Sequence, residues 1–282
     1  MAQIIADDPD GAAMRDARDA ALRGDAAAVA AWLTTPLSQS EFNRQWLLKH
    51  VCFGTGGPGS PACVRLLLEA GAVARHRELL NAIGRGNVDV VRLLVAESTI
   101  NVNRRVVCFT ALHRVAHGGA HPMMELQIGA PLPELVDILC AAGADPNARG
   151  ARNLAQQWGG VTPLMIAAQN HLAGVDTVQL LLRYGADVNA QDDDGRRVLD
   201  FARSGSREVE RLVTDVYLAG SFKRYLNAPR RELLGLRTLV ARGRAAPKEP
   251  CHFHARLFGS RLSLPDHLFW KILSFWASSR DL

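Results

Sequence analysis

Two segments of the chain are near copies of each other, and this internal repeat restricts the fold more than any other feature. They are VDILCAAGADPNAR at 136–149 and VQLLLRYGADVNAQ at 178–191. In each copy, aliphatic residues at helical spacing lead to a glycine, Gly143 or Gly185, that can take the left-handed backbone of a helix C-cap. The Ala-Asp-x-Asn-Ala that follows indicates a turn. A complete helix-and-turn unit that recurs predicts a repeat architecture, in which neighbouring units bury each other's apolar faces.

A matching first half precedes both copies. It reads TALHRVA at 110–116 and TPLMIAA at 162–168. Thr110 and Thr162 stand where a side-chain hydroxyl can cap a helix, and Pro163 lies in a first turn, where its missing amide proton costs nothing. Each complete unit is therefore predicted to contain two helices.

Weaker copies are located by their spacing from these two. The predicted helix-ending glycines are Gly24, Gly54, Gly86, Gly119 and Gly205. The predicted buried positions of the first helices are Leu47, Leu79, Leu112, Leu164 and Val198. The second helices are predicted to begin at Val29, Val64, Val91, Val136, Val178 and Val209. These positions predict six repeats, with a short link after the second repeat that leaves little room for a hairpin.

The TALH and TPLM segments resemble the Thr-Pro-Leu-His signature of the ankyrin-repeat family. The resemblance implies an all-α fold, namely an ankyrin-repeat solenoid of helix pairs with β-hairpin loops, plus a small helical C-terminal region. Hairpins are expected at 100–110, 144–162 and 186–196. The expected domains are an N-terminal tail at 1–12, an ankyrin-repeat domain at 13–215, a basic helical linker region at 216–261 and a C-terminal helix at 262–282.

The resemblance also implies a protein–protein interaction scaffold that binds a macromolecular partner through the concave face of hairpin tips and first helices. The hairpin before the fifth repeat is extended by NLAQQWGG at 153–160. Its Trp158 has little predicted core to join, so we predict that it is an aromatic anchor for the partner. The predicted partner-binding residues are Arg149, Arg152, Gln157, Trp158, Asp192 and Asp193.

After the repeats, TDVYLAGSFKRYL at 214–226 and ELLGLRTLVARG at 232–243 are each predicted to form a helix. A basic segment begins within the first of them. Residues 222–261 carry ten basic side chains against Glu232 and Glu249, whereas the whole chain has a net charge of +5. A solvated face is the simplest interpretation, but such a segment can also meet phosphate or an acidic protein surface. The alternative function is therefore a nucleic-acid-associated ankyrin protein that uses residues 222–261, although a protein partner is preferred.

The C-terminal segment LPDHLFWKILSFWASSRDL is strongly apolar and begins with a helix-start signal, Pro265 followed by Asp266. It resembles the opening of an F-box, as found in the truncated ends of PRANC-type proteins, and it is also similar to the end of a SOCS box. Both resemblances imply an adaptor of a cullin-type ubiquitin ligase that recruits a Skp-type or elongin-type protein. A helix that only caps the repeats is the competing interpretation. The implied adaptor-binding residues are Leu264, Pro265, Leu268, Phe269, Ile272, Leu273 and Trp276.

The sequence offers no pattern typical of an enzyme, because no segment combines a nucleophile with a base and an orienting group. Asp192, Asp193 and Asp194 lie at a hairpin tip, where solvation is expected to explain them. His113, His117 and His121 are spaced by four, but glycines end the helix before His121. The ankyrin resemblance implies instead that His113, the histidine of TALH, is hydrogen-bonded between repeats. Cys251, His252 and His254 have no matching ligand pair elsewhere, so neither a metal nor a cofactor is expected. GTGGPGS lacks the Gly-Lys-Ser/Thr of a phosphate-binding loop.

Composition places the chain among ordinary globular proteins, with 48% hydrophobic and 22% charged residues. No apolar run approaches the roughly 18 residues that a membrane span needs, and the acidic start lacks the basic flank of a secretory signal. The five cysteines are scattered, which favours reduced thiols. We therefore expect an intracellular protein, cytoplasmic or nuclear, with no membrane partner.

Overall fold

The computed structural model describes residues 9–53, 61–97, 100–118, 132–152 and 158–228. The chain divides into two compact units, Met1–Tyr217 and Leu218–Leu282. Within the described residues, every regular element is a helix, and β-pairing is limited to isolated bridges. The predicted all-α class is therefore confirmed.

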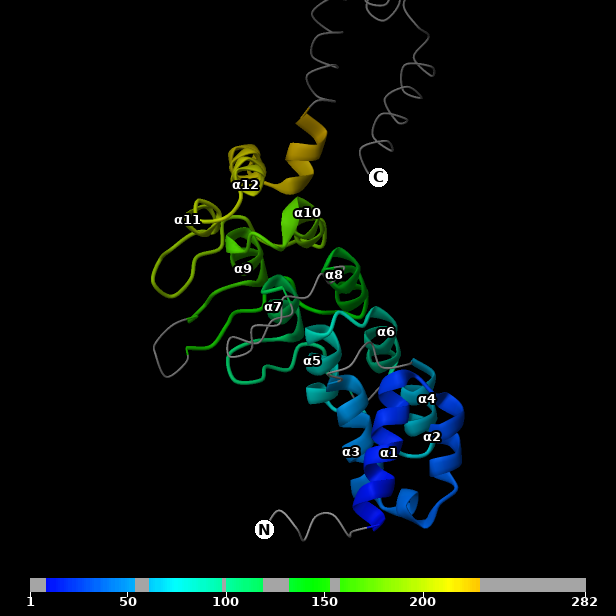
Figure 1. The fold of residues 1–282 in the computed structure, drawn as a ribbon. Helices are drawn as coiled ribbons and strands as arrows, with labels where there is room; N and C mark the ends of the chain where they lie inside the picture. Colours follow the sequence, from blue (N-terminus) through cyan, green and yellow to red (C-terminus); the bar gives the residue numbers. More distant parts are fainter. Residues whose placement is uncertain (1–8, 54–60, 98–99, 119–131, 153–157, 229–282) are drawn as a thin grey trace, which may run out of the picture. The chain divides into compact units, whose positions relative to one another are not determined.

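Twelve α-helices follow one another as six successive pairs in the part of the chain that the structure describes (Figure 1). The pairs are α1 (Pro9–Arg23) and α2 (Ala26–Leu33), α3 (Glu41–Phe53) and α4 (Pro61–Glu69), α5 (His76–Gly84) and α6 (Val88–Ala96), α7 (Ala111–Ala116) and α8 (Leu132–Ala141), α9 (Pro163–Gln169) and α10 (Gly174–Arg183), and α11 (Val198–Ala202) and α12 (Arg207–Ala219). A short 3-10 helix, η1 (Pro36–Gln39), connects the first two pairs.

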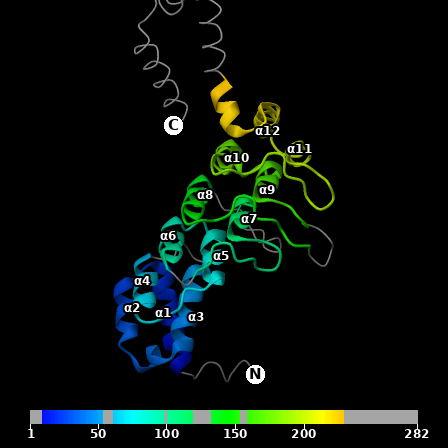
Figure 2. The ribbon, with the colours of Figure 1, turned by 180° about the vertical axis from the view of Figure 1, so that it is seen from behind.

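The helix pairs stack on one another in two rows, one of first helices and one of second helices. The first helices α1, α3, α5, α7, α9 and α11 contact one another in that order, and so do the second helices from α2 to α10. Figure 2 shows the two rows from behind. This is the arrangement of a solenoid, in which each unit buries its apolar face only against its neighbours.

The predicted register of aliphatic residues forms the core of this stack. Every leucine and valine predicted at a first-helix or second-helix position is at most 1% exposed, from Val29 at one end to Val209 at the other. Burying one such side chain contributes roughly 1.5–3 kcal/mol. The core is therefore a continuous row of equivalent positions, and its register follows from the sequence repeat.

Gly143 (φ +86°) and Gly185 (φ +89°) have the left-handed backbone that was predicted for the glycine at a helix C-cap. In the fourth repeat the left-handed residue is Gly118, whereas Gly119 and Gly54 lie outside the described residues. Gly205 lies just after the end of α11, but its backbone is not left-handed. A Cβ atom at Gly205 would lie 2.0 Å from the carbonyl oxygen of Ala168, so the first helix of the preceding pair leaves no room for one.

The hairpins are less regular than the predicted β-hairpin loops. Their described residues contain one antiparallel bridge between Val106 and Phe109 and another between Gln191 and Arg197. In the hairpin between them, the amide of Gly150 donates to Val161 O at 2.7 Å. The link between α4 and α5 contains no such pairing, as the sequence predicted.

The end of the described chain differs from the prediction. TDVYLAGSFKRYL was expected to form one helix, but α12 ends at Ala219 and Gly220 has a left-handed backbone (φ +80°). A separate helical segment covers 222–228. Glycine interrupts the helix because it takes a left-handed backbone without the penalty that other residues incur. Residues 229–282, with most of the basic segment and the whole F-box-like end, lie outside the described residues.

Candidate functional site

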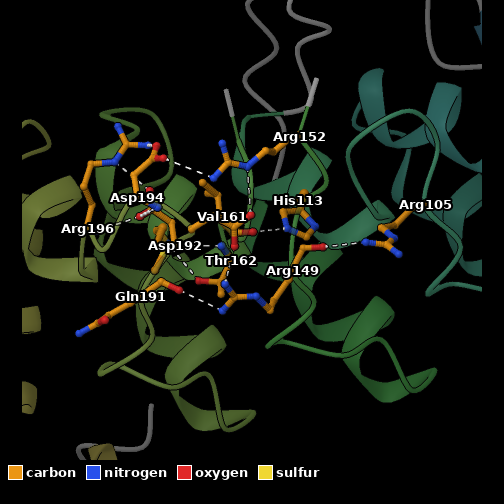
Figure 3. A network of polar contacts seen from close by, with 12 residues as sticks. Arg105, His113, Arg149, Arg152, Val161, Thr162, Gln191, Asp192, Asp194 and Arg196 are labelled. Atoms are coloured by element: carbon orange, nitrogen blue, oxygen red, sulfur yellow. Dashed lines mark hydrogen bonds and ion pairs between the residues drawn. The ribbon is translucent and has the colours of Figure 1, made fainter. Parts of the chain in front are cut away.

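The candidate site is the row of hairpins beside α7, α9 and α11, where polar side chains connect one repeat to the next (Figure 3). Its innermost member is His113, on α7, which is fully buried. His113 Nε2 lies 3.0 Å from the carbonyl oxygen of Val161, just before α9. The sequence prediction of a histidine hydrogen-bonded between repeats is confirmed.

The ring of His113 also organises the start of its own helix. Its Nδ1 accepts a hydrogen bond from the amide of Thr110 at 3.3 Å and lies 2.8 Å from the hydroxyl oxygen of Thr110. Since Nδ1 accepts, Nε2 carries the proton and donates to Val161 O. Burial lowers the pKa of His113 from 6.5 to about 4, which keeps the ring neutral. In the next repeat, the Thr162 hydroxyl accepts from the Met165 amide at 3.4 Å, as predicted for a cap.

An asparagine ladder connects the bases of the hairpins. Asn103 Nδ2 donates to Gly143 O at 2.9 Å, and Asn103 Oδ1 accepts from the amide of Asp145 at 2.7 Å. Asn147 makes the same pair of bonds to the next repeat, at 2.9 and 2.8 Å. Each asparagine thus satisfies one carbonyl and one amide of its neighbour, which fixes the spacing between hairpins.

A network of arginines and aspartates connects the tips of the two hairpins around α9. Arg149 Nη2 lies 2.9 Å from Asp193 Oδ1, and Arg149 Nη1 donates to Gln191 O at 2.9 Å. Arg152 Nε lies 3.5 Å from Asp193 Oδ2, and Arg152 Nη2 lies 3.6 Å from Asp194 Oδ1. These four charged side chains keep 37% to 53% of their surface exposed. Ion pairs this exposed contribute about 0–1 kcal/mol each, so they orient the groups more than they stabilise the fold.

Asp192 has a different environment from the two aspartates that follow it. Its side chain is fully buried. Its Oδ1 accepts from the amides of Asp194 and Arg196 at 3.0 and 2.8 Å, and its Oδ2 lies 2.8 Å from Arg196 Nε. The expectation that solvation explains all three aspartates was wrong for Asp192, because backbone amides of the turn satisfy its Oδ1 and the Arg196 side chain satisfies its Oδ2.

Close contact of two backbones brings the tips together. The amide of Asp193 donates to Gly159 O at 3.0 Å. A Cβ atom at Gly160 would lie 2.3 Å from Asp193 Oδ1, so no larger residue fits there without a shift. The two glycines after Trp158 therefore allow the charged tips to meet.

Trp158 lies at the edge of this network and is half-buried. The centre of its ring lies 5.6 Å from that of Phe109, at 74°, and 6.4 Å from that of His117. The premise that Trp158 has little core to join was wrong, because the preceding repeat supplies these two rings. Its left-handed backbone (φ +69°) is unusual for a residue with a side chain and costs of order 1 kcal/mol.

The structure thus brings five of the six predicted partner-binding residues onto two neighbouring hairpins. These are Arg149, Arg152, Trp158, Asp192 and Asp193. Gln157 and the predicted adaptor-binding residues lie outside the described residues. Sequence reasoning missed Phe109 and did not assign Asp194 and Arg196 to the network. The Asp-Asp-Asp-Gly-Arg run was the available signal, since an aspartate followed by a turn commonly binds backbone amides.

The described residues contain no cluster of three or more His, Cys, Asp or Glu side chains arranged to hold a metal ion. Burial raises the pKa of the Cys140 thiol to about 12 and also raises that of Cys52, so neither is a ready nucleophile. Among these residues, no helix is long and apolar enough to cross a membrane.

Residues 159–193 match the family model of the ankyrin repeat. The match covers α9, α10 and most of the hairpin that carries Asp192 and Asp193. It supports an ankyrin-repeat protein and agrees with the stack of helix pairs. The ankyrin repeat is a non-enzymatic interaction module, and its presence suggests protein–protein interaction.

Proposed function

We propose that this chain is a protein–protein interaction scaffold and that the hairpins at 145–152 and 187–197, together with Trp158, form its partner-binding surface. The observation that carries the proposal is the set of exposed arginines and aspartates held in fixed positions by contacts between repeats. Charged side chains that are already ordered lose less conformational entropy when a partner binds. The network therefore supports recognition of a surface with complementary charge.

Trp158 supplies the apolar part of this surface. Its half-buried ring packs edge-on against Phe109, and Arg152 lies against the neighbouring Gly159. Tryptophan and arginine are the residue types that most often dominate binding energy at protein interfaces. We propose that Trp158 and Arg152 contact the partner directly, while the buried Asp192 maintains the shape of the hairpin.

The test compares charge reversal at the hairpin tip with charge reversal elsewhere. Partners are captured with the full chain, identified by mass spectrometry and titrated as purified proteins against two variants. Arg152→Glu removes a cation from the network, whereas Arg211→Glu makes the same change on the exposed surface of α12. We expect Arg152→Glu to weaken binding by about tenfold or more and Arg211→Glu to have little effect.

Equal binding of the purified partner to both variants would exclude the hairpin tips as the binding surface. Circular dichroism of each variant shows whether the helical fold is retained. Because exposed ion pairs contribute little to folding, we expect both variants to keep the spectrum of the unchanged chain.

We further propose that the segment 262–282 recruits a cullin-type ubiquitin ligase while the repeats select the substrate. The resemblance of Leu264, Pro265, Leu268, Ile272 and Leu273 to the opening of an F-box supports this role. The same segment contains Trp270 and Phe275, which on a helix would not share the face of Leu268, Phe269, Ile272, Leu273 and Trp276. Burial by an adaptor protein would remove this apolar surface from water.

A further inference from the structure

A second recessed surface lies away from the hairpin network, on the repeats nearer the N-terminus. It is a pocket of about 630 Å3 between α3, the start of α5 and the hairpin that follows α6. The first helices and a hairpin tip form its walls, so it belongs to the same face of the stack as the proposed binding surface. Neither the sequence motifs nor the family match include it.

Two polar side chains that line this pocket are deeply buried. His76 is 5% exposed and Glu78 is 3% exposed. The Oε2 atom of Glu78 has no hydrogen-bond partner in the described part of the chain. Neither ring nitrogen of His76 makes a well-formed hydrogen bond there, although the backbone of Asn101 lies close enough to interact with the ring. A buried polar group without a partner costs free energy that a bound group of the right kind would recover.

Both groups suit a ligand that donates hydrogen bonds. Glu78 Oε1 already accepts from Gln45 Nε2 at 3.3 Å, which leaves Oε2 for another donor. Burial, and then the charge of Arg104, lower the pKa of His76, so the neutral ring keeps one nitrogen that can accept. Backbone amides of an extended peptide are donors of this kind.

The pocket also has an apolar wall that the repeat fold does not use. Phe42 lines it and is 75% exposed, although it belongs to the well-formed helix α3. Trp46 lies one helical turn further along α3, and Val106, on the hairpin, is 40% exposed. An exposed aromatic beside a recess is typical of a surface that receives an apolar side chain.

The rim of the pocket is cationic. Lys49, Arg75, Arg77 and Arg104 line it, against the single carboxylate of Glu78. All four cations are exposed, so they remain available to anions from outside. The pocket thus combines an apolar wall, a cationic rim and buried groups that accept hydrogen bonds.

We infer that this pocket binds an extended acidic segment of a protein partner, with one apolar side chain against Phe42 and carboxylates on either side of it. The inference rests on the proposed function and specifies the partner's chemistry at a second place on the same face. Carboxylates meet the cationic rim, the apolar side chain covers Phe42 and Trp46, and a peptide amide donates to Glu78.

A peptide fits these groups better than a nucleic acid does. The phosphate backbone would meet the cationic rim, but it has no amide to donate to Glu78, and the carboxylate would repel a phosphate placed close to it. The unpartnered Glu78 Oε2 atom therefore favours a peptide, whose N–H donors lie along its backbone, whereas those of a nucleic acid are confined to the bases.

The test uses the full chain and a defined peptide set. Labelled, capped heptapeptides carry Leu, Phe or Val at the centre and Asp or Glu on both sides, and binding is followed by fluorescence anisotropy. One comparison set replaces Asp and Glu by Asn and Gln. The other keeps the acids and replaces the central residue by glycine. Two variants alter the pocket: Phe42→Ala removes the exposed ring, and Arg77→Glu reverses one cation of the rim.

Each variant has a matched control outside the pocket. Leu172→Ala removes another exposed apolar side chain, between α9 and α10, and Arg65→Glu reverses an exposed cation on α4. Circular dichroism verifies that each protein is folded. Since all four positions are exposed, we expect none of these substitutions to unfold the chain.

We expect at least one acidic peptide to bind with a Kd below about 1 mM, with weaker binding at higher salt. Phe42→Ala and Arg77→Glu should each weaken it by about tenfold, while the two controls and the unchanged chain should bind alike. Both comparison peptide sets should bind more weakly than the acidic set.

Three results would overturn the inference: no acidic peptide binds, the pocket variants bind as well as the controls, or a single-stranded oligonucleotide displaces the peptide and binds more tightly. The last result would assign the pocket to nucleic acid. If captured partners still depend on Arg152 while no peptide binds, only this inference fails and the proposed function stands.

Discussion

At the scale of single residues, His113 joins two helix pairs through one imidazole ring. Its Nδ1 accepts from Thr110 at the start of α7, and its Nε2 donates to Val161 before α9. Only the neutral ring can do both, because a protonated imidazole has no acceptor. The contact between the fourth and fifth repeats is therefore sensitive to pH.

We expect the chain to lose stability as the pH falls from about 6.5 to about 4. Between these values His113 becomes protonated in the unfolded chain, whereas it stays neutral in the folded chain, where its pKa is about 4. The contribution of His113 is thus complete above pH 6.5 and decreases below it. At about 1.4 kcal/mol per pH unit, the loss attributable to His113 is roughly 3 kcal/mol. Urea unfolding at a series of pH values measures it.

The variant His113→Gln isolates this effect. The substitution removes the titrating group, so the slope of the free energy of unfolding against pH should decrease. The decrease should reach at most about 1.4 kcal/mol per pH unit, which corresponds to one proton. His171→Gln, at an exposed position, controls for the loss of one imidazole. Parallel pH profiles for His113→Gln and the unchanged chain would show that His113 does not couple folding to pH.

At the scale of the elements, the link between α4 and α5 shows how one side chain takes the place of a missing hairpin. Gln45, on α3, donates from Nε2 to Val73 O at 2.9 Å and accepts the Val73 amide on Oε1 at 3.1 Å. The amide group of the glutamine thus pairs with a backbone residue as a neighbouring strand would. This contact fixes the link in front of α5 and places Gln45 beside Glu78.

We expect Gln45→Leu to destabilise the chain by about 1–2 kcal/mol, because two backbone hydrogen bonds and one to Glu78 are lost at a partly exposed position. Gln169→Leu makes the same chemical change at an exposed residue of α9 and should alter stability by less than about 0.5 kcal/mol. Urea denaturation of both variants gives the comparison. Equal stability would show that the link is held in place without Gln45.

At the scale of the whole molecule, the proposed functions separate the selection of a partner from the recruitment of a ligase. We expect Leu273→Asp combined with Trp276→Asp to abolish co-purification of a Skp-type or elongin-type adaptor. The melting temperature should barely change, because an adaptor helix is buried by its partner and not by the repeats. Quantitative mass spectrometry and thermal unfolding measure the two effects on the same protein.

The control is Leu218→Asp, which introduces an acid at an exposed residue outside the F-box-like segment. It should leave both the adaptor and the melting temperature unchanged. A fall of several degrees in the double variant, with no adaptor bound to the unchanged chain, would identify the segment as a structural cap and end the ligase proposal.

Much of the fold was predictable because the solenoid repeats its local contacts. The valines and leucines at the predicted positions are buried since each repeat presents the same apolar face to its neighbours. The histidine of the TALH segment was predictable for the same reason. Spacing along the chain therefore determined the helix pairs, their order and the position of the hairpins beside α7, α9 and α11.

Only the tertiary structure decided which exposed groups act together. Gly205 is required by the Ala168 carbonyl, Asp192 is buried by the turn around it, and Trp158 is supported by Phe109 from the preceding repeat. The pocket around His76 and Glu78 is formed by α3, α5 and a hairpin far apart in sequence. These environments depend on distances between neighbouring repeats, which follow from how the helices pack and which no local pattern of residues encodes.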